Sequence, residues 1–138
     1  MSDRGEITAL VHSYAYLLDE GEVDAVAALF EHATWRSDSR DAVLRGSAEV
    51  RPVYEAMGPS GDGLRSRHLL TNLTVDVDPG ATTATSRCYW TVLRDDPGQG
   101  IRITLSGRYD DRFDKVDGRW RFADRLIRVD LGGSQSGP

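Results

Sequence analysis

Apolar side chains at the start of the chain repeat at helical spacing. Between residues 4 and 20 they fall on one stripe, formed by Ile7, Leu10, Val11, Tyr14, Leu17 and Leu18. This stripe predicts a helix over that range, with Asp3 as its N-cap. Gly21 interrupts the pattern, and a second, shorter helix is expected over 22–30.

Further along the chain the pattern becomes that of strands. Two short strands are expected over 33–38 and 42–45, and Ser47 is expected to cap a third helix over 48–57. The Gly, Pro, Ser and Asp residues at 58–63 then indicate a loop long enough to cover a cavity mouth. Beyond this loop, β-branched and aromatic runs predict four long strands, over 64–77, 82–94, 101–116 and 119–129.

The order of these elements predicts the fold class. Short turns separate the long strands, so successive strands are expected to be antiparallel neighbours. Helices in the first half and strands in the second predict an α+β fold, in which a cone-shaped, curved antiparallel sheet wraps around the N-terminal helices. The 138 residues suffice for one core, so we expect a single domain over 1–131 and a disordered tail over 132–138. Such a cone is expected to hold a pocket for small, largely apolar molecules.

Composition and charge argue against several kinds of partner. A net charge of −5 is unfavourable for binding nucleic acid, which requires a surplus of Lys and Arg on one face. No run approaches the roughly 18 apolar residues of a membrane span, and the N-terminus lacks the pattern of a secretory signal. The single cysteine, Cys88, allows no internal disulfide and no multi-cysteine zinc site, and it fits the reducing cytoplasm.

Catalysis in such a pocket without a cofactor requires a base, and a histidine oriented by a carboxylate is the simplest one. Of the three histidines, His12 and His32 are expected to be solvated. His68 begins the first long strand directly after the expected loop, where it can face the mouth of the cone. Asp19 is its candidate partner, because a carboxylate in the last turn of a helix opposes the helix dipole and is not explained by helix stability.

The residues alone leave a second interpretation of this pair open. Asp19 lies away from the centre of the apolar stripe and has the acidic neighbours Glu20 and Glu22, so a solvated corner also fits. Strict alternation groups His68 with Thr74 rather than with the apolar residues after it. A pocket-facing His68 therefore requires a β-bulge or a twist between residues 68 and 73.

Several motifs occur together in the pattern of one known family. Leu18-Asp19 ends the first helix, Leu29-Phe30 ends the second, and Trp35 follows in a strand. The first long strand contains Arg67-His68-Leu69-Leu70-Thr71-Asn72-Leu73, and the C-terminal strands contain Gly107-Arg108-Tyr109, Phe113 and the block from Asp117 to Phe122. From about residue 4 to residue 130 the chain resembles the SnoaL-like branch of the nuclear transport factor two-like superfamily. This resemblance implies the cone fold, and the superfamily contains isomerases, dehydratases, cyclases, hydrolases and members without catalytic activity.

Within that superfamily the pattern is most similar to hexachlorocyclohexane dehydrochlorinase, scytalone dehydratase and the bile-acid dehydratases. The resemblance implies that His68 is the base and that Asp19 orients it. The implied function is that of a cofactor-independent lyase or isomerase, dehydratase-like, which removes a carbon-bound proton from a small apolar cyclic substrate. The alternatives are a non-catalytic small-ligand-binding or assembly module and a polyketide-type aldol cyclase. A homodimer or higher homo-oligomer, formed through the outer face of the sheet, is also implied.

Two phenols on the first helix are further candidates for the site. Tyr14 and Tyr16 lie near Asp19, and a phenol can donate a hydrogen bond to a developing oxyanion, so Tyr14 is a candidate catalytic residue and Tyr16 a candidate substrate-binding one. Core packing is the alternative for Tyr14, which lies on the apolar stripe. Trp35 resembles a tryptophan near the dehydrochlorinase site and is a third candidate.

The remaining candidates lie on the long strands. Tyr89 and Trp90 point to opposite faces of their strand, so only one of them can line the pocket. Arg125 is a candidate ligand for a leaving group or a carboxylate, with a solvated or interface arginine as the alternative. No metal and no cofactor is expected, because Asp19 and His68 alone are too few ligands for a metal ion.

Overall fold

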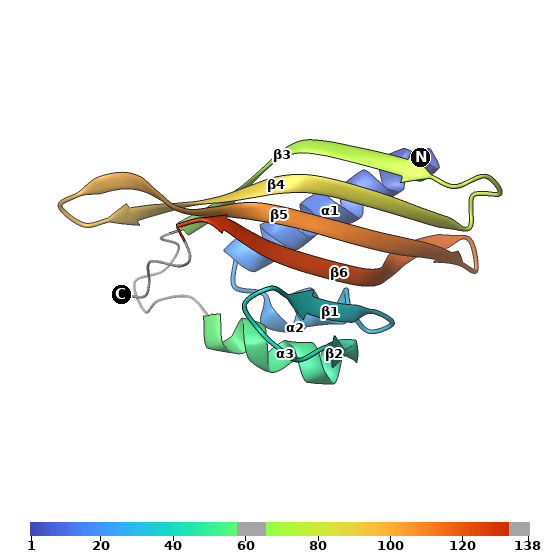
Figure 1. The fold of residues 1–138 in the computed structure, drawn as a ribbon, viewed down its shortest axis with the longest axis horizontal. Helices are drawn as coiled ribbons and strands as arrows, with labels where there is room; N and C mark the ends of the chain where they lie inside the picture. The colour runs from blue at the N-terminus through green and yellow to red at the C-terminus, as the bar shows by residue number, and fades with distance from the viewer. Residues whose placement is uncertain (58–65, 133–138) are drawn as a thin grey trace.

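The computed structural model describes residues 1–57 and 66–132 and gives a curved sheet with helices packed against it (Figure 1). Along the described chain the elements are α1 (Asp3–Asp19), α2 (Val23–Ala28), β1 (Thr34–Ser37), β2 (Leu44–Arg45), α3 (Gly46–Met57), β3 (Ser66–Val77), β4 (Thr83–Asp96), β5 (Gly100–Val116) and β6 (Arg119–Leu131). These elements match the predicted ones, with boundaries that differ by a few residues. The expected loop at 58–63, the first two residues of the 64–77 run and nearly all of the 132–138 tail lie outside the described residues.

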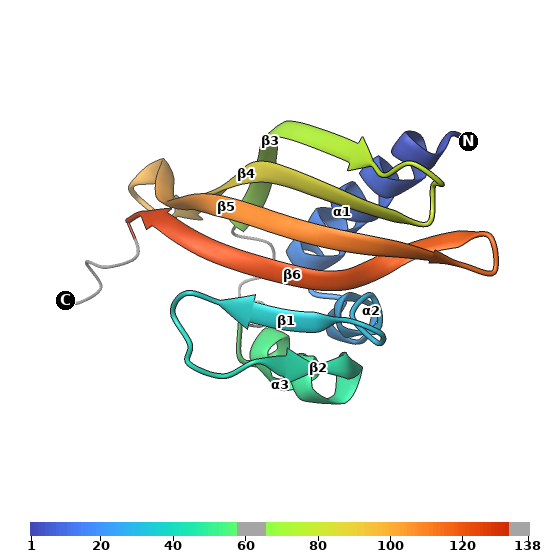
Figure 2. The same ribbon diagram turned by 45° about the vertical axis from the view of Figure 1, so that its right-hand side comes forward.

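The sheet has the strand order β2-β1-β6-β5-β4-β3. The antiparallel meander from β3 to β6 confirms the prediction from the short turns. The predicted curved antiparallel sheet has one parallel pairing, since β1 pairs with β6 in parallel, from Thr34 opposite Asp124 to Ser37 opposite Ile127. Figure 2 shows β1 beside β6 and β2 beyond it. A four-residue strand gives no sequence signal of its partner, so only the folded chain reveals this mixed, open sheet.

The core lies between the concave face of the sheet and the helices. Helix α1 crosses behind the long strands (Figure 1), and its buried residues include Ile7, Val11 and Tyr14, as the stripe predicts. Alternate residues of the strands face the same core, as in β4, where every second residue from Ala84 to Trp90 is buried. None of the helices formed by residues 1–57 is long and apolar enough to cross a membrane.

The helix starts differ from the predicted caps. Ser2 rather than Asp3 caps α1, because its Oγ accepts a hydrogen bond from Gly5 N at 3.0 Å. The Asp3 carboxylate instead accepts bonds from Trp120 Nε1 and Lys115 Nζ, both at 2.9 Å, and so ties the start of α1 to the β5–β6 hairpin.

At α3 the Ser47 side chain is not the cap either. The helix begins at Gly46, and the Glu31 carboxylate accepts hydrogen bonds from Ser47 N at 3.2 Å and from Ser47 Oγ at 2.8 Å. An acceptor from a distant part of the chain therefore satisfies one of the backbone N–H groups at the start of this helix.

Strand β3 contains the irregularity that a pocket-facing His68 requires. The pairing of β3 with β4 shifts register between Thr71 and Thr74, and Asn72 has a φ of 57°. These features are those of a β-bulge, which changes the phase of the strand. As a result His68 and Leu70 before the bulge, and Val75 after it, are all shielded from solvent. The irregularity that a pocket-facing His68 requires is therefore present in β3.

Candidate functional site

Asp19 and His68, which are 49 positions apart in the chain, meet where the end of α1 reaches strand β3. One carboxylate oxygen of Asp19 lies 2.7 Å from His68 Nδ1. Both oxygens also accept the backbone N–H of His68, at 3.0 and 3.1 Å. The carboxylate therefore fixes both the backbone and the ring of His68.

The position of this contact follows from the topology of the sheet. β3 is an edge strand, and His68 lies opposite Val92 of β4. The His68 N–H points away from β4 towards α1, so the Asp19 carboxylate occupies the place of an acceptor on a neighbouring strand. An acidic residue in the last turn of α1, which the helix dipole disfavours, is stabilised here by three hydrogen bonds.

The geometry determines which nitrogen of His68 is available for chemistry. When Nδ1 carries the proton and donates it to Asp19, the lone pair of Nε2 is free to accept another. No side chain among residues 1–57 and 66–132 forms a hydrogen bond with Nε2. The side chains of His68 and Asp19 are only 19% and 13% exposed, so water competes little for their mutual bond. Such an arrangement can remove a proton from a bound molecule.

A cavity of about 710 Å³ borders the pair. Its described walls come from one face of α1 and from the first half of β3: His12, Ala15, Tyr16, Asp19, Glu20, Arg67, His68, Leu69, Leu70 and Thr71. Tyr16, a predicted substrate-binding residue, therefore lies on the same cavity as the pair. His12 is exposed, as expected, but it also belongs to this wall, and sequence reasoning missed that role. Its spacing of four and seven positions from Tyr16 and Asp19, which places all three on one helical face, was the available signal.

The structure places Tyr14 and Trp35 in the core rather than on the described wall of this cavity. Trp35 Nε1 donates to the Tyr54 hydroxyl at 2.8 Å, and the hydroxyls of Tyr54 and Tyr14 lie 2.9 Å apart. Burial raises the pKa of Tyr54 well above its usual value, so this phenol stays a neutral hydrogen-bonding group. Sequence reasoning missed Tyr54, although it follows the buried Val50 and Val53 on one face of α3.

Arg125, the candidate ligand for a leaving group or a carboxylate, is fully buried, so the alternative of a solvated arginine does not hold. Its Nε and Nη2 donate to the two oxygens of Asp111 at 2.7 and 2.8 Å, and its guanidinium lies 4.2 Å from the Tyr14 ring centre and 3.9 Å from that of Tyr109. Burial opposes the charged form, but Asp111 outweighs it and keeps the pKa of Arg125 well above the usual value.

The register of the sheet separates Arg125 from the Asp19 and His68 pair. Arg125 lies opposite Asp111, and Asp111 lies opposite Ser86 of β4, whereas His68 lies opposite Val92. Ser86 and Val92 are six positions apart along β4, which corresponds to about 20 Å. Arg125 therefore belongs to the deep end of the concave face and His68 to its rim.

Tyr89 and Trp90 face opposite sides of β4, as predicted. Tyr89 is 49% exposed on the outer face, whereas Trp90 is 4% exposed and faces the core. Of the two, Trp90 is thus the residue on the side of the sheet that His68 faces.

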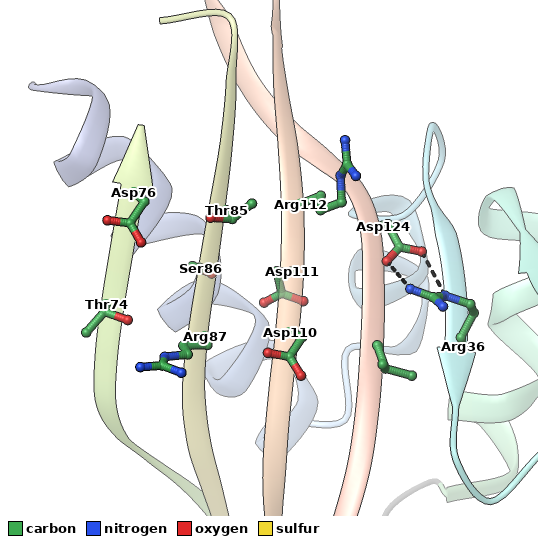
Figure 3. Close-up of a pocket in the computed structure, with 11 residues that line it drawn as sticks. Arg36, Thr74, Asp76, Thr85, Ser86, Arg87, Asp110, Asp111, Arg112 and Asp124 are labelled. Atoms are coloured by element: carbon green, nitrogen blue, oxygen red, sulfur yellow. Dashed lines mark hydrogen bonds and ion pairs between the residues drawn. The ribbon is translucent and has the colours of Figure 1, made fainter. Parts of the chain in front are cut away.

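The outer face of the sheet has a different character. A hollow of about 260 Å³ lies across β3 to β6 and β1 (Figure 3), and its lining alternates carboxylates with guanidinium groups. Arg36 pairs there with Asp124, with 2.7 Å between Nη2 and Oδ2. Its lining of charged and hydroxyl-bearing residues differs from the largely apolar lining typical of a small-molecule pocket. This hollow is therefore a weaker candidate for substrate binding than the cavity beside His68.

Within residues 1–57 and 66–132, no three His, Cys, Asp or Glu side chains gather closely enough to hold a metal ion. Asp19 and His68 bond to each other, and Cys88 is buried in the core.

Comparisons with known proteins agree with the fold and the motifs. The model of the SnoaL-like domain matches residues 1–126. Rv3472 from Mycobacterium tuberculosis, a protein of unknown function, is 31% identical, with a TM-score of 0.76 over 96% of this chain and 75% of that one. An NTF2-like protein with a cystatin-like fold from Novosphingobium aromaticivorans is 26% identical, with a TM-score of 0.78 over 97% of this chain and 85% of that one.

A candidate scytalone dehydratase from Novosphingobium aromaticivorans is also 26% identical, with a TM-score of 0.74 over 91% of this chain and 83% of that one. No curated protein matches the chain. The resemblance stated from the sequence motifs is confirmed by the family match over almost the whole chain and by these folds. The protein belongs to the family of SnoaL-like domains and has their NTF2-like, cystatin-like α+β fold.

Proposed function

We propose that this protein is a cofactor-independent lyase or isomerase, most similar in chemistry to a dehydratase. It would remove a carbon-bound proton from a small, largely apolar cyclic substrate. The observation that carries the proposal is the 2.7 Å contact between Asp19 and His68 Nδ1, beside a cavity large enough for such a molecule.

In the proposed mechanism His68 is the catalytic base and Asp19 is a positioning residue. Nε2 of His68 takes the proton from a carbon next to an activating group, which accepts the electron pair of the broken C–H bond. This pair forms the C=C bond when the C–O bond on the adjacent carbon breaks. The resulting imidazolium is stabilised by the Asp19 carboxylate. The imidazolium then returns its proton to a departing hydroxyl, so that water leaves. Tyr16 is the phenol on the cavity wall that would hold the leaving oxygen.

The family membership supports this class of reaction. SnoaL-like folds include polyketide cyclases and dehydratases, and the similar candidate scytalone dehydratase carries the name of one such enzyme. A polyketide-type aldol cyclase would begin with the same proton removal. The competing hypothesis of a binding or assembly module predicts Asp19 and His68 apart or solvent-exposed, and the observed contact does not favour it.

Proton removal can be tested without the natural substrate. Nitrobenzisoxazole opens to a coloured phenolate when a base removes its carbon-bound proton. We expect the protein to catalyse this reaction and His68→Ala to reduce the rate by about 10²- to 10⁴-fold, the contribution of a placed base. His32→Ala, which changes an exposed histidine outside the cavity, is the matched control. Equal rates for the wild type and His68→Ala would refute the proposal.

We also propose that the protein self-associates. Tyr89, Ile101 and Ile103 are large apolar side chains exposed on β4 and β5, and Ile103 is 71% exposed. A second copy covering them would remove this apolar surface from water. Sedimentation should therefore give a mass above that of one chain, and Ile103→Arg should lower it. A monomeric wild type would contradict this proposal.

A further inference from the structure

Trp90 lies next to the proposed base on the concave face of the sheet. In the pairing of β3 with β4, His68 lies opposite Val92 and Leu70 lies opposite Trp90. His68 and Trp90 are therefore diagonal neighbours on one face, about 7–8 Å apart at the backbone. Trp90 is one step deeper into the core than His68.

The indole of Trp90 is held in a fixed place over Gly107. A Cβ atom at Gly107 would lie 2.7 and 2.8 Å from Cζ2 and Cε2 of the indole, which leaves no space for any larger residue. Cε2 is bonded to Nε1, so the N–H edge of the ring is the one that lies near Gly107. Tyr109 stacks on the same indole, with 5.9 Å between ring centres and 23° between planes.

The N–H of this indole has no acceptor among the described residues, although it is buried. The other two tryptophans have one each, because Trp35 Nε1 donates to Tyr54 at 2.8 Å and Trp120 Nε1 donates to Asp3 at 2.9 Å. Buried donors in native proteins nearly always have a partner, since an unpaired one costs free energy. A buried N–H beside a base, with no acceptor in residues 1–57 and 66–132, is therefore suited to an acceptor on a bound molecule.

The side chains that neighbour Trp90 on this face of the sheet are apolar. On the same face, Val92 lies opposite Leu105, and Gly107 lies opposite Val129. Val92, Leu105 and Val129 are partly buried and pack against the core. The hydrogen bond would thus form in a region of low polarity, which strengthens it and favours a neutral cyclic ligand.

We propose that Trp90 Nε1–H donates a hydrogen bond to the carbonyl oxygen that activates the substrate carbon. This inference rests on the proposed function and narrows the substrate class to cyclic ketones with an acidic carbon next to the carbonyl. When His68 Nε2 takes the proton, the C–H electron pair forms a C=C bond and the carbonyl becomes an enolate oxygen. Trp90 keeps its own proton, and its bond to the oxygen strengthens as negative charge develops there.

The first test uses the unmodified protein and 2-naphthol, a bicyclic phenol that resembles an enol. The three indole N–H signals in the nitrogen-15 spectrum can be assigned with Phe substitutions at each tryptophan. Addition of 2-naphthol should move the Trp90 signal downfield and leave the Trp35 and Trp120 signals in place. Absence of 2-naphthol binding, or binding that leaves the Trp90 signal unmoved, would overturn the proposal.

The second test uses Trp90→Phe, which removes the N–H and keeps an aromatic ring over Gly107. This variant should bind 2-naphthol about 3- to 10-fold more weakly, the effect of one hydrogen bond, while naphthalene, which has no oxygen, should bind it as it binds the wild type. Trp120→Phe is the control, because it removes an indole N–H at the other end of the core. An equal loss of affinity for both ligands would refute the hydrogen bond. The naphthol signal does not depend on turnover, so it separates failure of this inference from failure of His68 as a base.

Discussion

The Asp19 carboxylate has two roles: it accepts the backbone N–H of His68, and it orients the ring through Nδ1. Replacing Asp19 by asparagine separates these roles. The asparagine carbonyl oxygen, in the place of Oδ2, can still accept the backbone N–H of His68, a bond now 3.1 Å long. Its amide nitrogen is a donor, however, and would face Nδ1, so that the ring proton moves to Nε2 and the base is lost. Asp19→Ala, by contrast, removes the acceptor for the backbone N–H as well.

The distance between Asp19 and His68 gives the expected magnitude. At 2.7 Å, the attraction between an imidazolium and a carboxylate is about 1.5 kcal/mol in bulk water and about 6 kcal/mol at an effective dielectric constant of about 20. Because the two side chains are mostly but not fully buried, the attraction between them is expected to lie between these two values, at about 3 kcal/mol. The rate with Asp19→Asn should therefore fall by about 100-fold.

Nitrobenzisoxazole turnover and urea denaturation together provide the assay. Asp19→Asn should lose rate and keep nearly all its stability, whereas Asp19→Ala should also lose about 1 kcal/mol of stability, because the His68 N–H is left without its acceptor. Glu20→Gln is the control, since it removes a negative charge from the same cavity wall without touching His68. A turnover rate of Asp19→Asn within threefold of the wild-type rate would mean that the carboxylate only accepts the backbone N–H of His68. That result would refute the role of Asp19 in orienting the base.

Three further predictions concern the stability and reactivity of the core. Burial raises the pKa of the Cys88 thiol to about 12, so about one thiol in 10⁴ is ionised at pH 8 and mass spectrometry should detect no alkylation by iodoacetamide until the protein is unfolded. The hydrogen bond from Trp120 is the main cause that lowers the pKa of Asp3 below 3.8. Its contribution to stability is therefore complete above that value and lost as the pH falls further, so the melting temperature of Asp3→Asn should fall less steeply below pH 4 than that of the wild type. Arg125→Met leaves Asp111 buried without its partner and should lose about 3–5 kcal/mol in urea denaturation. The double variant, with Asp111→Leu added, should be more stable than Arg125→Met, and the reverse order would contradict the account of the buried pair.

Much of the fold follows from local patterns in the sequence. The apolar stripe through Val11 and Tyr14 predicts α1, and the β-branched runs with short turns between them predict the meander from β3 to β6. Alternation along β3 also shows where a bulge or a twist is required if His68 and Val75 are both to face inward. These predictions succeed because each depends on residues close together in the chain.

The parts that sequence reasoning missed depend on contacts between distant segments. Nothing near Thr34 shows that β1 pairs with β6, and nothing near Ser47 shows that Glu31 caps α3. From the sequence alone, Arg125 can be a solvated surface residue, and only the position of Asp111 on the adjacent strand explains its burial. For the site, the residues predicted Asp19 and His68 as one possibility among others, and the structure supplies the distance between them.

The bond from the His68 main chain to Asp19 also has a consequence for evolution. An edge strand with a free N–H invites another chain to add to it, and an acceptor at the end of α1 blocks that addition whether or not any reaction takes place. A relative that has lost catalysis would still be selected to keep an acceptor at this position, while its histidine could be replaced by another residue. On the proposed mechanism, we therefore expect the histidine to be a better marker of a working enzyme among SnoaL-like domains than the aspartate.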